Sequence, residues 1–236
     1  MKVIHISSWA KFHLEIQKTD ARFAIFRGVT NVSKDKLKPS VGHIQPRSSS
    51  MKRRTKKEAI LFEEGRMFAK FKERAVANLS SIPTNDWEWL ALAQHHGLPT
   101  RLLDWTLNPL VAAWFAVEKK KFVGDSAVYI YTLKEIIKPE QMQCKSFTPF
   151  SVDSVARFFP PHLTPRIRVQ AGLFTVHPHP WQVLPDDDSL VQLRIVSHFR
   201  EKLKRILFRY GVHSQSLFPD LDGLSKHLRW ISTSQY

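Results

Sequence analysis

The stretch from residue 94 to 109 holds the densest group of side chains in the sequence that could do chemistry. It reads QHHGLPTRLLDWTLNP, which combines amide, imidazole, guanidinium, carboxylate, indole and hydroxyl groups. Such groups are costly to bury unless they are hydrogen-bonded to partners. The stretch therefore predicts either an internal polar network or the lining of a binding site, and the residue types alone leave both readings open.

The adjacent histidines His95 and His96 raise the question of a metal site, but their spacing argues against one. Neighbouring residues of a helix point about 100° apart, whereas zinc helices place histidines at i and i+4. His177 and His179 could share one side of an extended segment, but no third ligand accompanies them. We therefore predict no metal. The sequence also lacks the P-loop, the G-x-G-x-x-G fingerprint and the G-x-S-x-G elbow, which weighs against the enzymes that use them.

The charge of the chain points to anionic partners. The formal net charge is +15, and lysines and arginines crowd into a basic stretch at residues 29–58. Such a charge favours nucleotides, nucleic acids or anionic surfaces as partners. We expect residues 29–58 to form a basic mobile loop, which either is solvated or attracts a ligand that carries phosphates.

Composition bounds the class of protein. Hydrophobic residues make up 43% of the chain and charged residues 24%, which is typical of a globular domain. Cys144 is the single cysteine, so no disulfide can form within the chain. The first residues lack the apolar core of a signal peptide and no apolar run reaches about 20 residues, so we expect a cytoplasmic protein with no membrane partner.

Helical and strand-like patterns alternate along the chain, and they predict an α+β fold with a small central sheet flanked by helices. Ser8, Asn85 and Asn108 are placed to cap helices, and Gly97 is placed to end one. The expected helices cover 8–16, 63–79, 85–97, 108–117, 198–210 and 217–229, and the expected strands cover 22–26, 100–106, 126–133, 166–177 and 190–196.

Several segments together resemble the FRG domain. They are 26–28 (FRG), 94–106, 108–109, 112–116, 166–167 with 170–174, and 216–224, in that order along the chain. The resemblance extends from Trp9 to Leu228 and implies a single FRG-like domain over residues 1–236.

The order of elements resembles ADP-ribosyltransferases more remotely, which implies NAD as the substrate. It also implies an ADP-ribosyltransferase or an NAD-consuming toxin that acts in bacterial conflict or phage defence. In this resemblance Arg27 matches the motif of the first strand, residues 100–106 match the second motif, and Gln170 stands where the family has a glutamate. Because Gln170 is neutral, Asp104, Asp220 or Asp222 would have to supply the negative charge that stabilises a cationic ribose.

The resemblance also implies roles for individual residues. Arg27 would hold pyrophosphate oxygens, the backbone beside Gly28 would grip the nicotinamide amide, and Trp105 would stack on its ring. The predicted catalytic residues are Arg27, His96, Asp104 and Gln170, and the predicted nucleotide-binding residues are Arg27, Gly28, Thr100, Arg101 and Trp105.

Structural roles compete with these. Arg27 could be paired with Asp104 and Arg101 with Asp222, while Asn108, Asp220 and Asp222 could cap helices. Two other functions also compete: nucleic-acid binding without catalysis, and a nuclease with His95 or His96 as general base.

Overall fold

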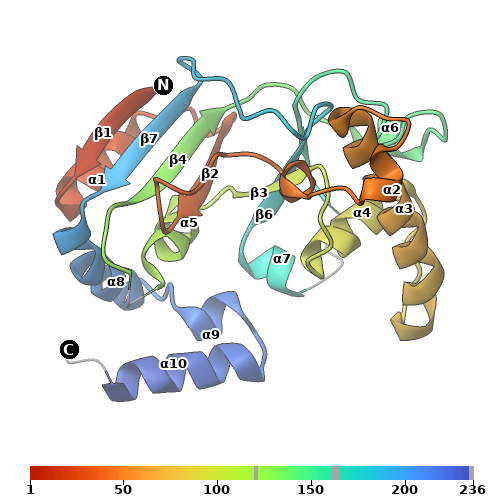
Figure 1. Cartoon of the computed structure of the whole chain (residues 1–236). Helices are drawn as coiled ribbons and strands as arrows, with labels where there is room; N and C mark the ends of the chain where they lie inside the picture. The colour runs from red at the N-terminus through yellow and green to blue at the C-terminus, as the bar shows by residue number, and fades with distance from the viewer. Residues whose placement is uncertain (120–121, 161–164, 234–236) are drawn as a thin grey trace.

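The computed structural model describes residues 1–119, 122–160 and 165–233, and its centre is one mixed seven-stranded sheet (Figure 1). Only β1 and β7 are parallel neighbours, and every other pair of neighbouring strands is antiparallel. In spatial order the strands are β1 (Lys2–Ile6), β7 (Leu190–Ile195), β4 (Ser126–Thr132), β2 (Ala24–Val29), β3 (Leu102–Thr106), β6 (Gly172–Val176) and β5 (Ala156–Phe158).

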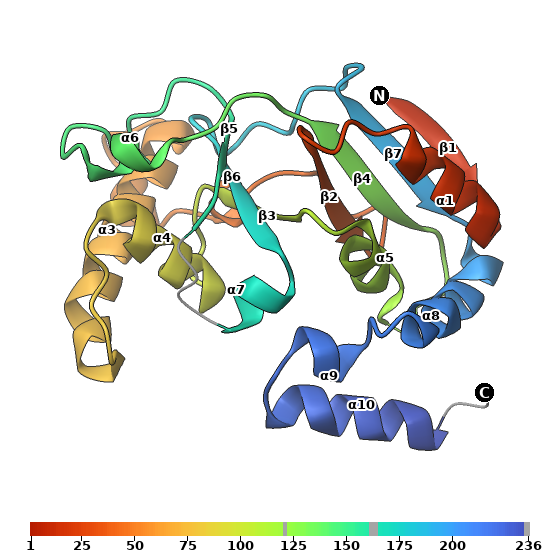
Figure 2. The same ribbon diagram turned by 180° about the vertical axis from the view of Figure 1, so that it is seen from behind.

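Helices flank this sheet at both ends, so the expected α+β class is confirmed. Near the β1 edge lie α1 (Trp9–Gln17) and α8 (Arg200–Arg209), whereas α5 (Pro109–Val117) packs against β2 and β4 in the middle of the sheet (Figure 2). The helices near β5 and β6 are α2 (Ser48–Met51), α3 (Lys56–Ala75), α4 (Asp86–His95), α6 (Pro139–Gln143) and α7 (Pro165–Val169). Two further helices, α9 (Ser214–Leu217) and α10 (Leu221–Thr233), pack on each other below the sheet. Short 3-10 turns are η1 (Ser40–His43), η2 (Val76–Asn78) and η3 (Ser197–Phe199).

Alternation along the strands divides the core between the two faces of the sheet. Phe26 and Ile130 pack with α1, α5 and α8 in one cluster, whereas Ile25 and Tyr131 pack on the opposite face in another. The second of these clusters also takes in Trp105 and Leu37. A third cluster joins α3 and α4 to β3, β5 and β6.

The predicted helix ends are confirmed. Ser8 accepts a hydrogen bond from the backbone N–H of Lys11 (3.3 Å), and Asn108 accepts one from that of Leu110 (2.9 Å) ahead of Pro109. Gly97 follows α4 with φ +83°, a conformation that glycine adopts without steric cost.

Several expected boundaries were wrong. The strand expected at 22–26 runs over Ala24–Val29, because Arg27 and Gly28 continue the pairing with β4 instead of ending it. The strand expected at 166–177 is helix α7 followed by strand β6, with a sharp turn at Ala171 (φ +45°). Apolar alternation hid this break, since a short helix and a strand can carry the same few apolar residues.

Three further corrections concern the ends and the basic stretch. The strand β1 was not expected; it is an edge strand that pairs only with β7. Residues 29–58 hold η1 and α2, and α3 already begins at Lys56 behind a capping box formed by Thr55 and Glu58. The last helix covers Leu221–Thr233 instead of 217–229. Among the described residues, no helix is long and apolar enough to cross a membrane.

Candidate functional site

The sheet is nearly divided between β2 and β3. β2 pairs with β4 through six residues and β3 pairs with β6 through five, yet β2 and β3 pair only through Phe26 and Thr106. The two strands diverge beyond this single pair, so the backbone on both sides of the split lacks its usual ladder of hydrogen bonds. A split of this kind leaves room for side chains and for a ligand in the middle of a sheet.

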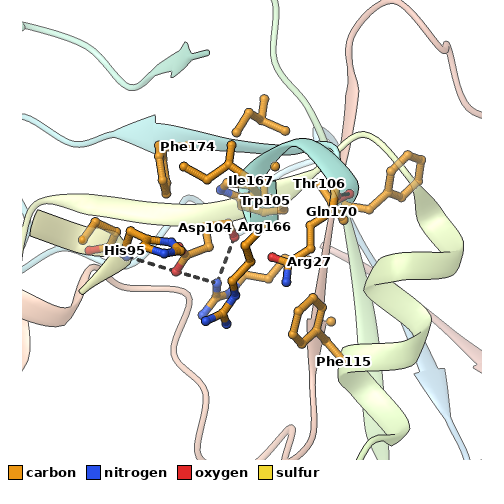
Figure 3. A pocket seen from close by; sticks show the side chains of 15 residues that line it. Arg27, His95, Asp104, Trp105, Thr106, Phe115, Arg166, Ile167, Gln170 and Phe174 are labelled. Atoms are coloured by element: carbon orange, nitrogen blue, oxygen red, sulfur yellow. Dashed lines mark hydrogen bonds and ion pairs between the residues drawn. The ribbon is translucent and has the colours of Figure 1, made fainter. Parts of the chain in front are cut away.

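A pocket of about 410 Å³ lies at this split (Figure 3). Its volume is within the range of small-molecule sites in proteins. It is lined by residues of β2, α4, β3, α5, α7 and β6, among them Arg27, Gly28, His95, Asp104, Phe115, Arg166 and Gln170. Five residues from the predicted catalytic and nucleotide-binding sets therefore meet here: Arg27, Gly28, Asp104, Trp105 and Gln170.

Arg27 connects the two sides of the split. Its Nη1 donates a hydrogen bond to the backbone carbonyl oxygen of Asp104 (2.9 Å). Asp104 is in the part of β3 that does not pair with β2. The ion pairs of Arg27 are longer, with 3.8 Å from Nη1 to Asp104 Oδ2 and 3.6 Å from Nη2 to Asp35 Oδ2. Its Nε is buried and has no hydrogen-bond partner among the described residues. Nη2 makes no hydrogen bond to the described residues, so Arg27 keeps donors beside the pocket that a ligand could use.

Arg166 is a second arginine at the same pocket, and it comes from α7. Its guanidinium carbon lies 4.3 Å from the ring centre of Phe218, a cation–π contact that orients the side chain. Within the described parts of the chain it has no carboxylate or hydrogen-bond partner. Two arginines from distant segments therefore face one cavity with few acceptors to satisfy them.

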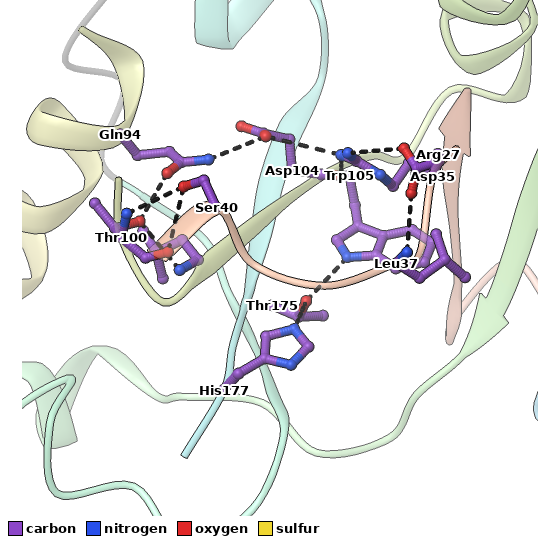
Figure 4. A network of polar contacts seen from close by, with 11 residues as sticks. Arg27, Asp35, Leu37, Ser40, Gln94, Thr100, Asp104, Trp105, Thr175 and His177 are labelled. Carbon is purple, nitrogen blue, oxygen red and sulfur yellow. Dashed lines mark hydrogen bonds and ion pairs between the residues drawn. The ribbon is translucent and has the colours of Figure 1, made fainter. Parts of the chain in front are cut away.

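Asp104 is the carboxylate of this pocket, and a polar network holds it in place (Figure 4). Gln94 donates from Nε2 to Asp104 Oδ2 (3.0 Å) and accepts at Oε1 from the Thr100 hydroxyl (2.7 Å). The Thr100 backbone N–H in turn donates to Ser40 Oγ (3.2 Å). The Asp104 side chain is 60% exposed, so it is both oriented and accessible to a ligand.

Gly28 and Gln170 line the pocket, but the structure gives each a structural reason. A Cβ on Gly28 would lie 1.8 Å from the carbonyl oxygen of Ala112, so glycine is required for the approach of α5 to β2. The Gln170 side-chain amide donates from Nε2 to the backbone oxygen of Leu217 (3.0 Å). The backbone carbonyl oxygen of Gln170 accepts from the Thr106 hydroxyl (2.7 Å). Gln170 therefore ties α9 and β3 to the turn before β6.

The histidine at the pocket is His95, whereas the prediction named His96. His96 is the C-cap of α4, where the backbone leaves the helix, and its side chain faces a different groove between α3 and α4. Burial lowers the pKa of His95, the charges of His96 and Arg166 lower it further, and Asp104 opposes them. His95 is therefore biased toward the neutral imidazole beside the pocket.

Two other predicted binding residues, Thr100 and Arg101, do not line the pocket. Arg101 and Thr100 are buried, and Arg101 forms an ion pair with Glu64 (Nη2–Oε2, 2.6 Å) where Asp222 was expected. Trp105 is in the pocket lining but only 4% exposed. Its indole donates to Thr175 Oγ1 (2.9 Å) and lies against Tyr131 in the core, which leaves little of the ring for stacking on a ligand.

The acidic residues near the last helix have a structural role too. Asp220 accepts a hydrogen bond from the Gly223 backbone N–H (2.7 Å) at the start of α10. A Cβ on Gly223 would lie 1.9 Å from the carbonyl oxygen of Phe218, so this glycine allows close packing. The expected capping role of Asp220 is confirmed, and neither Asp220 nor Asp222 lines the pocket.

Comparison of the chain with models of protein families finds one matching family. Residues 22–123 match the family model of the FRG domain. An FRG domain is therefore present over residues 22–123. The matched range contains Arg27, His95 and Asp104 on β2, α4 and β3, and it ends before α7, which carries Arg166.

The other comparisons add no relatives. Neither the curated proteins nor the solved structures yield a match to this chain. The resemblance of the segments beyond residue 123 to the FRG family, and the remote resemblance to ADP-ribosyltransferases, therefore stay predictions.

Proposed function

We propose that this FRG-domain protein binds a nucleotide at the split between β2 and β3, and that the nucleotide is NAD. The observation that carries the proposal is the bonding of Arg27, whose two ion pairs are long and whose Nη2 makes no hydrogen bond to the described residues. A guanidinium can donate five hydrogen bonds, and its planar fork matches the oxygens of a phosphate. Arg166 adds a second guanidinium at the same pocket.

The reaction proposed for this site is cleavage of the bond between ribose C1′ and nicotinamide. The electron pair of that bond leaves with the nicotinamide nitrogen, and positive charge builds on the ribose, as in glycoside cleavage. A hydroxyl or water then forms the new bond to C1′ and loses a proton. Asp104 is the carboxylate at the pocket that would stabilise the cationic ribose. It would replace the glutamate that ADP-ribosyltransferases have at the position of Gln170.

His95 is the residue that would accept the proton from the attacking group. Its pKa is lowered by burial, so it is biased toward the neutral imidazole that a general base requires. The neighbouring His96 faces another groove and gives a matched control. We expect His95→Ala to slow turnover at least tenfold and His96→Ala to leave it unchanged.

The test of the reaction separates turnover from binding. Asp104→Asn keeps an oxygen for Gln94 but removes the charge, so nicotinamide release should be lost while NAD still binds. The control is Asp188→Asn, which removes the same charge from an exposed residue outside the pocket. Release of nicotinamide at the wild-type rate by Asp104→Asn would refute the role of Asp104.

A cellular readout follows from the same variant. A protein that consumes NAD would act as a toxin, in line with the resemblance to enzymes of bacterial conflict and phage defence. Expression of the wild type should lower cellular NAD and arrest growth, and Asp104→Asn should do neither. Equal growth arrest by both proteins would count against NAD consumption as the cause.

A further inference from the structure

A second recess lies next to the proposed nucleotide pocket and shares part of its lining. Its volume is about 240 Å³, and it shares Arg27, Gln94 and Asp104 with the first pocket. Its wall also holds three lysines from the segment between β2 and η1, Lys34, Lys36 and Lys38, and His43 at the end of η1. Asp35, Ser40, Leu102 and Leu103 complete the lining. Both recesses are therefore bordered by the same arginine, Arg27.

The basic segment has a built conformation. The Asp35 carboxylate accepts a hydrogen bond from the Leu37 backbone N–H (2.9 Å), and its other oxygen lies 3.6 Å from Arg27 Nη2. Leu37 is 6% exposed and has φ +46°, a strained value for a residue with a side chain. Its carbonyl oxygen also accepts from the Leu184 backbone N–H (3.3 Å). Strain of this kind persists only where the surroundings hold it, and it is common at functional sites.

The contacts of Asp35 and Leu37 hold this segment in place. Three lysines next to these two residues, Lys34, Lys36 and Lys38, line the recess. Lys34 and Lys36 are exposed, Lys38 is half-buried, and none has an ion-pair partner in the described ranges. Burial lowers the pKa of the Lys38 ammonium, and the charges of Lys36 and Lys56 lower it further. An anion in the recess would relieve this repulsion.

We propose that Lys34, Lys36 and Lys38 form a second anion subsite, which holds the phosphodiester backbone of a single-stranded nucleic acid beside the nucleotide pocket. The inference rests on the proposed function, since it names the acceptor of the ADP-ribosyl group. A base inside a duplex cannot reach a pocket without being flipped out, whereas a single strand presents its bases directly. Single strands are bound by positively charged grooves that follow the backbone.

The test measures the binding of a short fluorescent oligothymidylate to the full chain by anisotropy over a series of salt concentrations. The variant replaces Lys34, Lys36 and Lys38 with alanine together. Each lost phosphate contact lowers the slope of log K against log salt by about 0.7 for a single strand, so the slope should fall by about 2. Affinity at physiological salt should fall at least tenfold.

The matched control replaces Lys2, Lys11 and Lys202 with alanine, which removes the same charge from exposed positions on β1, α1 and α8. Circular dichroism checks the fold of both variants. An equal effect of the two triple replacements on affinity and slope would overturn the subsite. A duplex that binds as tightly as the single strand, with the same dependence on the three lysines, would overturn the choice of a single strand.

A separate titration of the wild type with NAD distinguishes the two proposals. Lysine-dependent binding of the oligonucleotide without binding of NAD would support the subsite and refute the proposed nucleotide. If NAD binds and the affinity for the oligonucleotide does not depend on the three lysines, the proposed nucleotide would be supported and the subsite refuted.

Discussion

The guanidinium of Arg27 donates to the backbone carbonyl oxygen of Asp104 across the split in the sheet, at 2.9 Å from Nη1. A side chain here takes the place of the strand pairing that ends at Phe26 and Thr106. The same contact fixes the guanidinium at the mouth of two recesses. Structural pairing of Arg27 and a ligand-binding role are therefore compatible, because the pairing uses one donor and leaves others.

Replacement of Arg27 by lysine should weaken nucleotide binding although it keeps the charge. An ammonium cannot donate to the Asp104 carbonyl and grip a phosphate with a planar fork at once. Loss of one hydrogen bond to a charged group costs about 1.5–3 kcal/mol, so the Kd for ADP should rise about 10- to 100-fold. Calorimetric titration measures this, with Arg22→Lys, an exposed arginine just before β2, as the control. Unchanged affinity in Arg27→Lys would show that a point charge is sufficient.

Gly28→Ala should destabilise the protein through α5. The new Cβ would meet Ala112 O at 1.8 Å and Ala116 N at 2.8 Å, both of which are backbone atoms of the helix. Overpacking of this kind costs about 1–3 kcal/mol in the free energy of unfolding. Gly65→Ala is the matched control, because it lies in α3 with no atom within 4 Å of the new Cβ and should stabilise by about 0.5–1 kcal/mol. Urea denaturation measures both, and equal stability of the two variants would contradict the account.

Arg101→Ala should act on stability, since its partner Glu64 would be left charged in the core. The two side chains are 4% and 1% exposed. Breaking a buried pair costs about 3–5 kcal/mol, and replacing both partners by Met and Leu should restore much of it. The control is Lys72→Ala on the same helix as Glu64, where the pair with Asp86 is partly exposed and contributes under about 1 kcal/mol. A folded Arg101→Ala protein of wild-type stability that fails to bind nucleotide would instead assign Arg101 to the ligand.

Stability should fall with acid because of His177. Burial lowers the pKa of His177 from 6.5 to about 3, and the charges of Arg27 and Arg101 contribute. The unfolded chain therefore binds an extra proton between these values, so the contribution is complete above pH 6.5 and is lost as the pH falls toward 3. The slope is at most about 1.4 kcal/mol per pH unit. In His177→Gln the slope of the unfolding free energy over this range should be smaller, and in the exposed control His5→Gln it should match the wild type.

The local structure around the site was predictable from the sequence, whereas its long-range pairing was not. Asn108 and Gly97 are signals that act within a few residues, and the helix ends they predicted are where the structure has them. Arg101, just before β3, pairs with Glu64, which lies 37 residues away on helix α3, and no local pattern indicates that choice. The limited pairing of β2 with β3 likewise depends on how two distant halves of the sheet meet.

The exact residue at which α4 ends explains why His95 lines the pocket although the prediction named His96. His95 is the last residue of α4 and His96 its cap, so a change of one residue turns a side chain from the pocket to a different groove. Arg166 was missed as a site residue for a related reason, since its segment was expected to be a strand and is helix α7. A proline at the start of that segment, Pro165, was the signal that could have indicated a helix.

The most direct test of the nucleotide site is a calorimetric titration of NAD into the wild type and two double variants. Arg27→Ala with Arg166→Ala removes both guanidinium groups from the pocket, and Arg22→Ala with Arg168→Ala removes exposed arginines that neighbour them in the sequence. The account predicts that the wild type and the control bind NAD alike and that the pocket variant binds at least about 100-fold more weakly, since each charged hydrogen bond contributes about 1.5–3 kcal/mol. Equal affinity of the two double variants, or no binding of NAD to the wild type, would contradict it.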